Sequence, residues 1–437
     1  MTLPVLPDHP LRYELNNELH ARPFPELKAP CRAAYIVIKM PEKAVERDRA
    51  KDRAHLLALL DRHGAPHPAP DADHYSGRVG RNFLKWELHT EFMSYTIFAD
   101  SVADIPFNGT VFSIFPKDWL AEAPGAILTS AIVRIEEVAD EDEMQQVIDR
   151  KFPKWFVPEN LTVSRVADDE AVVAGDFRID ENGHNRFAIL SRPGISPRRL
   201  GRIVQRLLEV ETYKTASMLT LPIARRVSRT VFEMDRELTE IVQQMAEDDG
   251  SDQPESLHRL LEMSAKIEFL SSSTAFRFGA AEAYAAIVNQ RIQVMREGRV
   301  KGKQLFSEFM MRRYDPAMRT CRSAQARLAD LSLRAERAAN LLRTRVDVKT
   351  EEQNHEVLKQ MDRRAELQLR LQETVEGLSV VAIGYYAVSL AGYFLTPIAK
   401  NFGIDKTTVL AAVTLPILLI VYLGMRRIHH RVAKLRG

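Results

Sequence analysis

Two apolar stretches near the C-terminus constrain the fold more than any other feature of the sequence. Residues 378–398 and 407–425 contain 21 and 19 residues, and neither stretch has a charged side chain. As a helix, either stretch extends about 30 Å, the thickness of the hydrocarbon layer of a bilayer. The alternative is a buried hairpin of a soluble core, but two such runs separated by only eight residues are rare there. The sequence therefore predicts a hairpin of two transmembrane helices.

Basic residues after the second apolar stretch predict the orientation of this hairpin. The tail 426–437 has five lysines and arginines and no acid, whereas the loop 399–406 has two lysines and one aspartate. The positive-inside rule then places both termini in the cytoplasm and the loop outside. Because the tail lies next to the predicted membrane surface, we expect its basic side chains to contact lipid headgroups. These side chains are Arg426, Arg427, Arg431, Lys434 and Arg436.

Small residues mark one face of the first apolar stretch. Gly384, Ala387 and Ala391 have i, i+3, i+7 spacing, which places them on the same side of a helix. Small side chains let another helix approach closely, so we expect this face to be a packing face. The partner is either the second apolar stretch or another subunit. Together with the long helix before it, this face predicts a homo-oligomer.

Composition predicts that the rest of the chain is folded and cytoplasmic. The 437 residues include 61 basic and 59 acidic side chains, and this near-balance argues against nucleic acid as a partner. The two cysteines, Cys31 and Cys321, lie far apart, which fits a reducing compartment and argues against a cysteine-ligated metal. The first residues, MTLPVLPDHPLRYELNN, lack the apolar core of a signal peptide, so we expect no secretory signal.

The pattern over residues 1–192 predicts a cytoplasmic α/β domain within a chain of the α+β class. Residues 42–62 predict a helix that ends at His63 and Gly64, and the acidic run 136–149 predicts the start of another helix or a whole one. Residues 82–99 predict a hairpin that turns near 89–91. The remaining expected strands cover residues 33–40, 126–137, 162–166, 171–179 and 186–190, and Asn182-Gly183 predicts a turn between the last two.

Residues 193–377 predict a long-helix stalk domain, with helices over 200–246, 255–297 and 304–377. The polar segment KTEEQNHE interrupts the apolar stripe of the last helix, so we expect no continuous coiled coil. We expect instead a stalk helix that is packed by the two preceding helices and continues into the membrane. The stripe consists of Leu328, Leu331, Ala335, Ala338 and Leu342, and then of Val357, Met361 and Ala365.

Arginines are concentrated in the segment 312–345, which has nine of them and three acids. Arginine forms bidentate contacts with carboxylates and phosphates. The segment ends about 32 residues before the first apolar stretch, a helical distance far beyond the Debye length of about 8–10 Å, so these arginines are not expected to bind lipid. We expect them to pair with acidic patches such as 136–149, within or between subunits.

The most distinctive candidate for a binding site is the string NELHARPF at residues 17–24. Its polar side chains could bind an anion or support acid–base chemistry, or they could pin an N-terminal arm to its domain. These candidates are Asn17, Glu18, His20 and Arg22. Seven of the twelve histidines lie in the first 89 residues, but none forms an HExxH pair on a helix. His63 and His67 are four residues apart, but Gly64 and a proline-rich loop lie between them, so we expect no metal and no cofactor. The GxSxG, GxGxxG and P-loop motifs are absent, and nothing in the sequence argues for an enzyme.

Three motifs carry a resemblance to a known family. NNELHARPF at 16–24, LLRTRVDV at 341–348 and LQLRLQETVEGLSVVAIGYY at 367–386 resemble an uncharacterised family of bacterial membrane-anchored proteins, domain of unknown function 3422. The resemblance extends from about residue 9 to the basic tail. It implies an inner-membrane protein of a Gram-negative bacterium, and it implies no activity because the family has none assigned.

The layout is also similar to that of CorA-type magnesium channels, in which an α/β domain and a stalk helix precede two spans. That family has an aromatic-Gly-Met-Asn motif at the outer end of the first span, and the corresponding residues here, 392–397, lack it. The loop is net basic, which would repel a dication. The resemblance implies a pore lined by the first span of five copies. The residues that would line it are Tyr386, Ser389, Tyr393 and Thr396.

Two functional classes follow from the sequence. The first is a non-enzymatic anchor, scaffold or sensor whose cytoplasmic domain binds a protein or a small molecule. The absence of aspartate, glutamate, lysine, arginine and histidine from both apolar stretches favours it. The second is a CorA-like cation channel or transporter, which requires oligomerisation because two helices enclose no pore. A divalent cation is expected only for this second class. An enzyme hidden in the α/β domain is a weaker third class.

Overall fold

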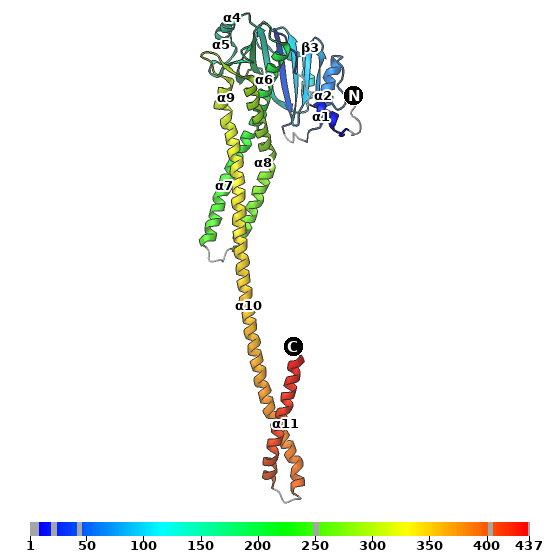
Figure 1. Ribbon diagram of the computed structural model, residues 1–437, viewed down its shortest axis with the longest axis vertical. Coiled ribbons are helices and arrows are strands. Elements are labelled where there is room, and N and C mark those ends of the chain that lie inside the picture. Colours follow the sequence, from blue (N-terminus) through cyan, green and yellow to red (C-terminus); the bar gives the residue numbers. More distant parts are fainter. Residues whose placement is uncertain (1–7, 19–23, 42–45, 248–252, 401–404, 436–437) are drawn as a thin grey trace. The chain divides into compact units, whose positions relative to one another are not determined.

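The computed structural model describes residues 8–18, 24–41, 46–247, 253–400 and 405–435 (Figure 1). The chain divides into two compact units, Met1–Ala339 and Asn340–Gly437, and each is described by itself. The first unit contains α1 (Arg12–Glu18), a β-sheet and the helices packed on it. The second unit contains the later part of α10 (Asp315–Lys400) and all of α11 (Lys406–Leu435).

The described strands of the first unit form one nine-stranded sheet in the order β2-β3-β4-β1-β5-β8-β7-β6-β9. β5 and β8 pair in parallel, and the other ladders between these strands are antiparallel. β1 lies inside the sheet and is covered on both faces, which explains its nearly continuous apolar sequence. The strands are β1 (Cys31–Lys39), β2 (His74–Val79), β3 (Asn82–Leu88), β4 (Phe92–Asp100), β5 (Ala126–Glu137), β6 (Thr162–Val166), β7 (Ala171–Ile179), β8 (Asn185–Ser191) and β9 (Gly298–Arg299).

Short helices cover one face of the sheet. α2 (Arg49–Arg62) and α3 (Lys117–Ala121) pack on the half that contains β1 to β4, in a core centred on Trp86 and Trp119. In that core, His55 of α2 bonds Tyr95 and the Trp119 carbonyl, at 2.9 and 3.0 Å. A second core covers β5 to β8. It is formed by α4 (Glu141–Gln146), a π-helical turn (Val147–Lys151) and α5 (Phe152–Trp155), and two short 3-10 turns (Gly109–Ile114 and Pro158–Asn160) complete this layer.

Long helices cover the opposite face. The hydroxyl of Tyr35 on β1 lies 2.7 Å from that of Thr212 on α6 (Pro197–Met218), whereas Ala34 and Ile36 of β1 point into the α2 core. α6 packs on α8 (Gln253–Met295), and α7 (Thr220–Glu247) packs on α8 as well. After α8 the chain returns to the sheet edge, where β9 pairs with β6. The predicted stalk segment therefore also supplies a strand to the sheet.

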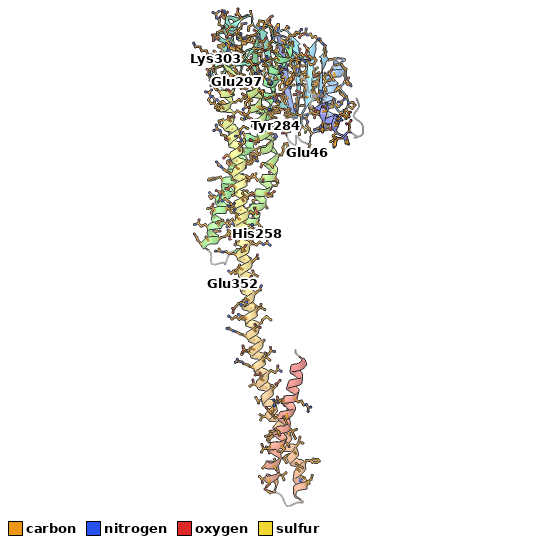
Figure 2. All side chains as sticks on the ribbon, viewed as in Figure 1. Glu46, His258, Tyr284, Glu297, Lys303 and Glu352 are labelled. Atoms are coloured by element: carbon orange, nitrogen blue, oxygen red, sulfur yellow. The ribbon has the colours of Figure 1, made fainter. Side chains whose placement is uncertain are left out.

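The polar turn after α8 is fixed by Glu297, which is labelled in Figure 2. Its carboxylate accepts hydrogen bonds from the Ser164 hydroxyl of β6 and from the Ser307 backbone N–H, both at 3.0 Å. Ser307 lies in α9 (Phe306–Arg313), so one carboxylate joins the sheet edge to the next helix. Sequence patterns did not indicate this role of Glu297.

The first part of α10 packs against α7 and α8, as the apolar stripe predicted. Leu328, Leu331, Ala335 and Ala338 are buried. Two ion pairs flank this stripe: Arg322 contacts Glu282 of α8 at 2.9 Å, and Arg334 contacts Asp235 of α7. The prediction that two preceding helices pack the stalk helix is confirmed for this part of the chain.

The strands and turns predicted for residues 82–99, 126–137 and 162–190 are confirmed, whereas the start of the helix predicted over residues 42–62 was placed too early. Residues 82–99 form β3 and β4, which pair in antiparallel register. α2 begins at Arg49 rather than near residue 42. Asp48 caps its N-terminus by accepting a hydrogen bond from the Ala50 N–H at 2.9 Å, so α2 does not extend back past Asp48. Residues 42–45 of the predicted helix lie outside the described residues.

In the second unit, α10 and α11 pack on each other through small residues. A Cβ added at Gly384 would lie 3.0 Å from Leu418, and one at Gly392 would lie 3.3 Å from Leu410. Ala387 and Ala391 are half-buried. Before this contact, the side chains of 351–375, including Glu352 in Figure 2, are exposed, so Val357 and Met361 of the predicted stripe have no packing partner within the described unit.

Gly201 of α6 provides a test of the packing around the N-terminal segment. A Cβ at this position would lie 1.6 Å from the carbonyl oxygen of Pro25, so Gly201→Ala forces the backbone apart. We expect a loss of about 1–3 kcal/mol in the free energy of unfolding. Urea unfolding followed by tryptophan fluorescence measures this loss, because Trp86, Trp119 and Trp155 all lie in the first unit.

Gly279→Ala is the matched control on α8, where nothing lies within 4 Å of the added Cβ. Because alanine favours the helix interior, this variant should be more stable by about 0.5–1 kcal/mol. Equal stability changes in the two variants would contradict the packing described for Gly201.

Candidate functional site

The side chains of the four predicted binding residues lie outside the part of the chain that the structure describes. Asn17 and Glu18 are at the end of α1, and only their backbone is described. His20 and Arg22 lie outside the described residues altogether. Phe24, the last residue of the same string, is described and lines a pocket between the sheet and α6. The proposed role of the string therefore stays a prediction, and the described site is built from other residues.

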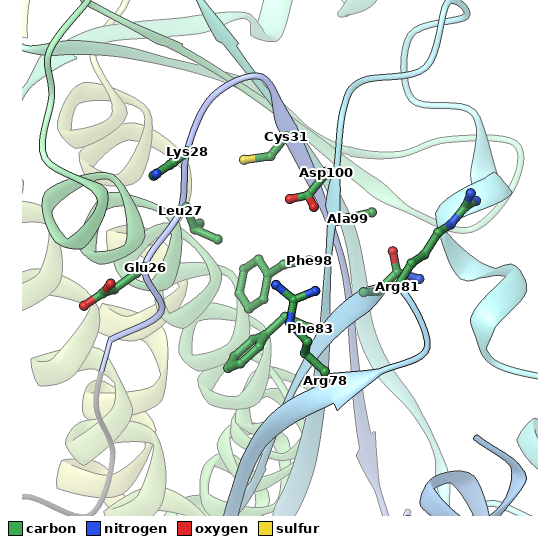
Figure 3. A pocket seen from close by; sticks show the side chains of 11 residues that line it. Glu26, Leu27, Lys28, Cys31, Arg78, Arg81, Phe83, Phe98, Ala99 and Asp100 are labelled. Carbon is green, nitrogen blue, oxygen red and sulfur yellow. The ribbon is translucent and has the colours of Figure 1, made fainter. Parts of the chain in front are cut away.

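One hollow of about 150 Å³ lies beside Cys31, at the end of the ladder between β1 and β4 (Figure 3). Cys31 pairs in register with Asp100, and Arg78 and Arg81 line the outer part of the hollow. Burial, followed by the charge of Asp100, raises the pKa of the Cys31 thiol to about 12. The thiol is therefore neutral at physiological pH and lacks the thiolate that nucleophilic catalysis needs.

A second pocket of about 260 Å³ lies between the sheet, α6 and α8, and we call it the aromatic pocket. Side chains from β1, from β3 and the turn after it, from α6 and from α8 meet there. The antiparallel β3–β4 hairpin and the packing of α6 on α8 bring these distant segments together. The lining residues are Phe24, Tyr35, Glu87, His89, Phe92, Gln205, Glu209, Thr212, Tyr213 and Arg291.

Aromatic rings form one wall of this pocket. The rings of His89 and Phe92 lie 4.5 Å apart, and Tyr213 of α6 stands edge-on to Phe92 at 6.1 Å. Tyr284 of α8 extends the cluster, with its ring 5.4 Å from that of Tyr213. Such pairs stabilise a rigid wall that has both apolar faces and polar tips.

A chain of polar contacts also borders this pocket. Lys85 contacts Glu87 at 3.0 Å and donates to Gln205 at 2.9 Å. Gln205 donates to Glu209 at 2.8 Å, and Glu209 forms an ion pair with Arg291 of α8. Fixed donors and acceptors together with aromatic rings are typical of a pocket that orients a small polar ligand.

The buried carboxylate of Glu91 fixes α8 beside this pocket. Glu91 lies in the turn between β3 and β4, and its side chain is 2% exposed. It contacts Lys39 of β1 at 3.0 Å, and it accepts hydrogen bonds from Arg277 at 2.6 Å and Tyr284 at 2.8 Å, both of α8. Burial by itself would raise the pKa of Glu91, but the hydrogen bonds from Arg277, Tyr284 and Lys39 outweigh it and the pKa is lowered.

Glu211 fixes α6 to the sheet in the same way. Its carboxylate, which is 1% exposed, accepts hydrogen bonds from Thr129 of β5 at 3.1 Å and from Asn185 of β8 at 3.2 Å. Lys214, one turn later on α6, contacts the other carboxylate oxygen at 2.7 Å. The two helices that line the aromatic pocket are thus both held by buried carboxylates.

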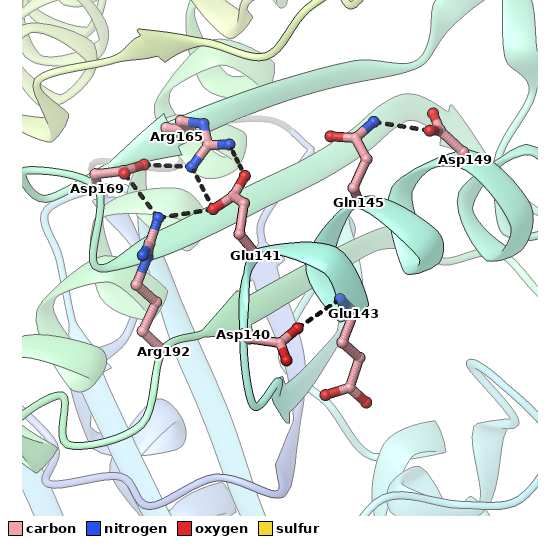
Figure 4. A network of polar contacts seen from close by, with 8 residues as sticks. All are labelled: Asp140, Glu141, Glu143, Gln145, Asp149, Arg165, Asp169 and Arg192. Carbon is pink, nitrogen blue, oxygen red and sulfur yellow. Dashed lines mark hydrogen bonds and ion pairs between the residues drawn. The ribbon is translucent and has the colours of Figure 1, made fainter.

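The acidic run 136–149 does not pair as the sequence predicted. Its Glu141 forms ion pairs with Arg165 and Arg192 rather than with the arginine-rich segment 312–345, and Asp169 contacts both of these arginines (Figure 4). For Glu141 the prediction of pairing within the chain is wrong, because Arg165 of β6 and Arg192, which follows β8, lie beside the turn before β7. Pairing of the arginine-rich segment between subunits stays a prediction. The hydrogen bonds that Arg165 donates to Glu141 and Asp169 outweigh desolvation and raise the pKa of Arg165, so this cluster is a compensated structural network.

The predicted membrane residues are described in part. Tyr386 and Tyr393 are 66% and 78% exposed, and Ser389 is half-buried, whereas the side chain of Thr396 lies outside the description. Arg426 and Arg427 are exposed. The side chains of Arg431 and Lys434, and all of Arg436, lie outside the described residues.

Sequence reasoning missed the residues that build the aromatic pocket. Glu87 and His89 lie beside a predicted turn, but Tyr213 and Arg291 are 78 residues apart on helices with no local motif. The pocket depends on which helices cover which face of the sheet. No group of three histidine, cysteine or acidic side chains suited to a metal is found in the described parts of the chain, so metal ligands do not mark a site there.

These features define a class: a mixed α/β protein with a pocket of about 260 Å³ on its sheet and, by length and composition, two C-terminal helices apolar enough to cross a membrane. The chain belongs to the family described as protein of unknown function (DUF3422), whose model matches residues 7–432. No curated protein matches the chain in sequence. The family resemblance expected from the sequence motifs is therefore confirmed.

The pKa of Glu91 predicts how the stability of the first unit depends on pH. Because its pKa is lowered in the folded state, the Glu91 cluster stabilises the fold above the ordinary value near 4.5, and this stabilisation is lost as the pH falls below it. Glu91→Gln leaves Lys39 and Arg277 without their carboxylate and should destabilise the unit by about 3–5 kcal/mol at neutral pH. Urea unfolding by tryptophan fluorescence at several pH values measures both effects.

The matched control is Glu308→Gln, which removes an exposed carboxylate that contacts Arg299 at the surface. This control should cost less than about 1 kcal/mol. If Glu91→Gln is no more destabilising than Glu308→Gln, the structural role of the cluster is wrong.

Proposed function

We propose that this protein is a non-enzymatic, membrane-anchored binding protein whose first unit holds a small polar ligand in the aromatic pocket. The observation that carries the proposal is a contrast between the two units. The first unit buries its large apolar side chains in two cores, whereas the second exposes them along α10 and α11. A unit that exposes such side chains is stable only in apolar surroundings.

Exposure along the hairpin supports the membrane anchor. Phe394 of α10 is 78% exposed and Leu415 of α11 is 77% exposed, although α10 and α11 pack on each other. The two helices bury only the narrow face around Gly384 and Gly392. The basic tail supports an orientation in which the hairpin crosses a bacterial inner membrane and both of its ends lie on the cytoplasmic side.

The state of the reactive side chains supports binding rather than catalysis. Burial raises the pKa of both thiols, Cys31 and Cys321, so neither is ionised at neutral pH. His55 has both ring nitrogens engaged within the α2 core, and burial lowers its pKa. His89 packs against Phe92 in the wall of the aromatic pocket, where an oriented ring contributes contact area.

The second candidate function is an oligomeric channel. It is favoured by Tyr386 and Tyr393, whose exposed rings lie seven residues apart on one face of α10, away from the Gly384 face that contacts α11. Five copies that placed this face around an axis would form a pore. Mass photometry of the detergent-purified chain tests this function, since a monomer or dimer excludes such a ring.

Cysteine labelling tests the proposed anchor and its orientation. Lys406→Cys introduces an accessible thiol at the start of α11, and Arg427→Cys introduces one near its other end. In spheroplasts, a membrane-impermeant maleimide should label Lys406→Cys, whereas Arg427→Cys should react only after lysis. The wild-type chain is the control, because its buried, neutral thiols react slowly. Labelling of both variants before lysis would contradict the proposal.

Native mass spectrometry tests the pocket. The full chain, released gently from detergent, should retain a small molecule that Tyr213→Ala loses, because this substitution removes the α6 part of the aromatic wall. Phe232→Ala, at an exposed position on α7, is the matched control and should retain the molecule. The binding proposal fails if the wild type and both variants retain the same additional mass, or none, above the mass of the chain.

A further inference from the structure

A groove of about 760 Å³ lies beside the N-terminal half of α6 and the end of α8, and we call it the arginine groove. Four arginines line it: Arg199, Arg202 and Arg206 of α6, and Arg296, which directly follows α8. The acid in its lining is Asp168. The groove is distinct from the aromatic pocket, which lies along Gln205 and Glu209 of the same helix.

Helical spacing explains why the arginines meet there. Arg199, Arg202 and Arg206 have i, i+3, i+7 spacing, so one face of α6 carries all three. Arg296 adopts a left-handed backbone conformation, with φ of 51°, where α8 ends and the chain turns towards β9. This conformation is uncommon for arginine, and the turn places its side chain on the rim of the groove.

Two of the four arginines are compensated by acids. Arg199 contacts Glu170 at 2.6 Å and Asp168 at 2.7 Å, and Arg296 contacts Asp168 at 2.6 Å. These carboxylates hold the two side chains at the edge of the groove. Their charges are therefore largely neutralised before any ligand arrives.

Arg202 and Arg206 have no carboxylate at ion-pair distance within the described residues. Both side chains are half-buried. Arg206 donates a hydrogen bond to the Val294 carbonyl at 3.1 Å, which orients its guanidinium without balancing its charge. Burial and then the neighbouring charges of Arg202 and Arg291 lower the pKa of Arg206, which shows that positive charge accumulates here. An anion in the groove would relieve this repulsion.

We propose that the arginine groove binds a phosphorylated molecule through Arg202 and Arg206. Two adjacent guanidinium groups match the oxygen geometry of phosphate, and each can donate two parallel hydrogen bonds. The groove is larger than a phosphate group alone requires, and the partly exposed Val294 offers apolar surface to the rest of the ligand. The shared chemistry is a phosphate group with at least one attached substituent, from either a soluble molecule or a lipid headgroup.

The test is isothermal titration of the full chain in nanodiscs, with inorganic pyrophosphate as the probe. In phosphatidylcholine nanodiscs, the wild type should bind pyrophosphate, and Arg202→Gln/Arg206→Gln should weaken binding by ~10-fold or more. The matched control is Arg225→Gln/Arg229→Gln, which removes two exposed arginines with the same spacing from α7 and should bind like the wild type. Tryptophan fluorescence checks that both double variants fold.

Nanodiscs that contain phosphatidylglycerol distinguish the two sources of phosphate. Retained pyrophosphate binding assigns the groove to a soluble phosphorylated molecule, whereas loss of binding assigns it to a lipid headgroup. Either result supports phosphate recognition by the groove. Absence of binding in phosphatidylcholine nanodiscs, or equal weakening in the two double variants, overturns the proposal. The aromatic pocket and the membrane anchor are tested separately and do not depend on this outcome.

Discussion

The buried carboxylate of Glu91 determines where α8 lies on the sheet. Taking a carboxylate out of water is costly unless several donors replace the water, and here Lys39, Arg277 and Tyr284 do so. Lys39 belongs to β1, and the other two residues belong to α8. All three contacts to the Glu91 carboxylate therefore form together only when α8 holds this position against β1. α8 then carries Arg291 into the aromatic pocket and ends beside the arginine groove. The geometry of both hollows therefore depends on this one interaction.

The aromatic pocket and the arginine groove are both lined by α6, and charges in one act on charges in the other. Gln205 and Glu209 of α6 face the aromatic pocket, and Arg202 and Arg206 face the groove. Arg291 lines the pocket, yet its charge lowers the pKa of Arg206 in the groove. The positive charge of Arg291 repels that of Arg206, and an anion bound near Arg206 would offset this repulsion. If both proposals hold, occupation of one hollow would change the electrostatic potential in the other.

Local sequence patterns predicted the elements but not their arrangement. Residues 82–99 were correctly predicted as a hairpin because strand alternation and the turn are both local, and the stripe from Leu328 to Ala338 is buried because its spacing follows the helix. The pairing of β9 with β6, across more than 130 residues, had no local signal. The partners of Glu141 were missed for the same reason: Arg165 and Arg192 become its neighbours only once β6 and β8 flank β7. The site residues Glu87, Tyr213 and Arg291 likewise depend on which helices cover the sheet.

The second unit follows most directly from the sequence, because its constraint is composition rather than long-range contact. Two charge-free stretches form helices that pack through Gly384 and Gly392 and leave most of their apolar side chains exposed. The central claim is that this hairpin is integral to a bilayer. Alkaline carbonate extraction of membranes from cells that express the full chain tests it most directly. The account predicts that the protein stays in the membrane pellet, and its release into the supernatant would contradict the account.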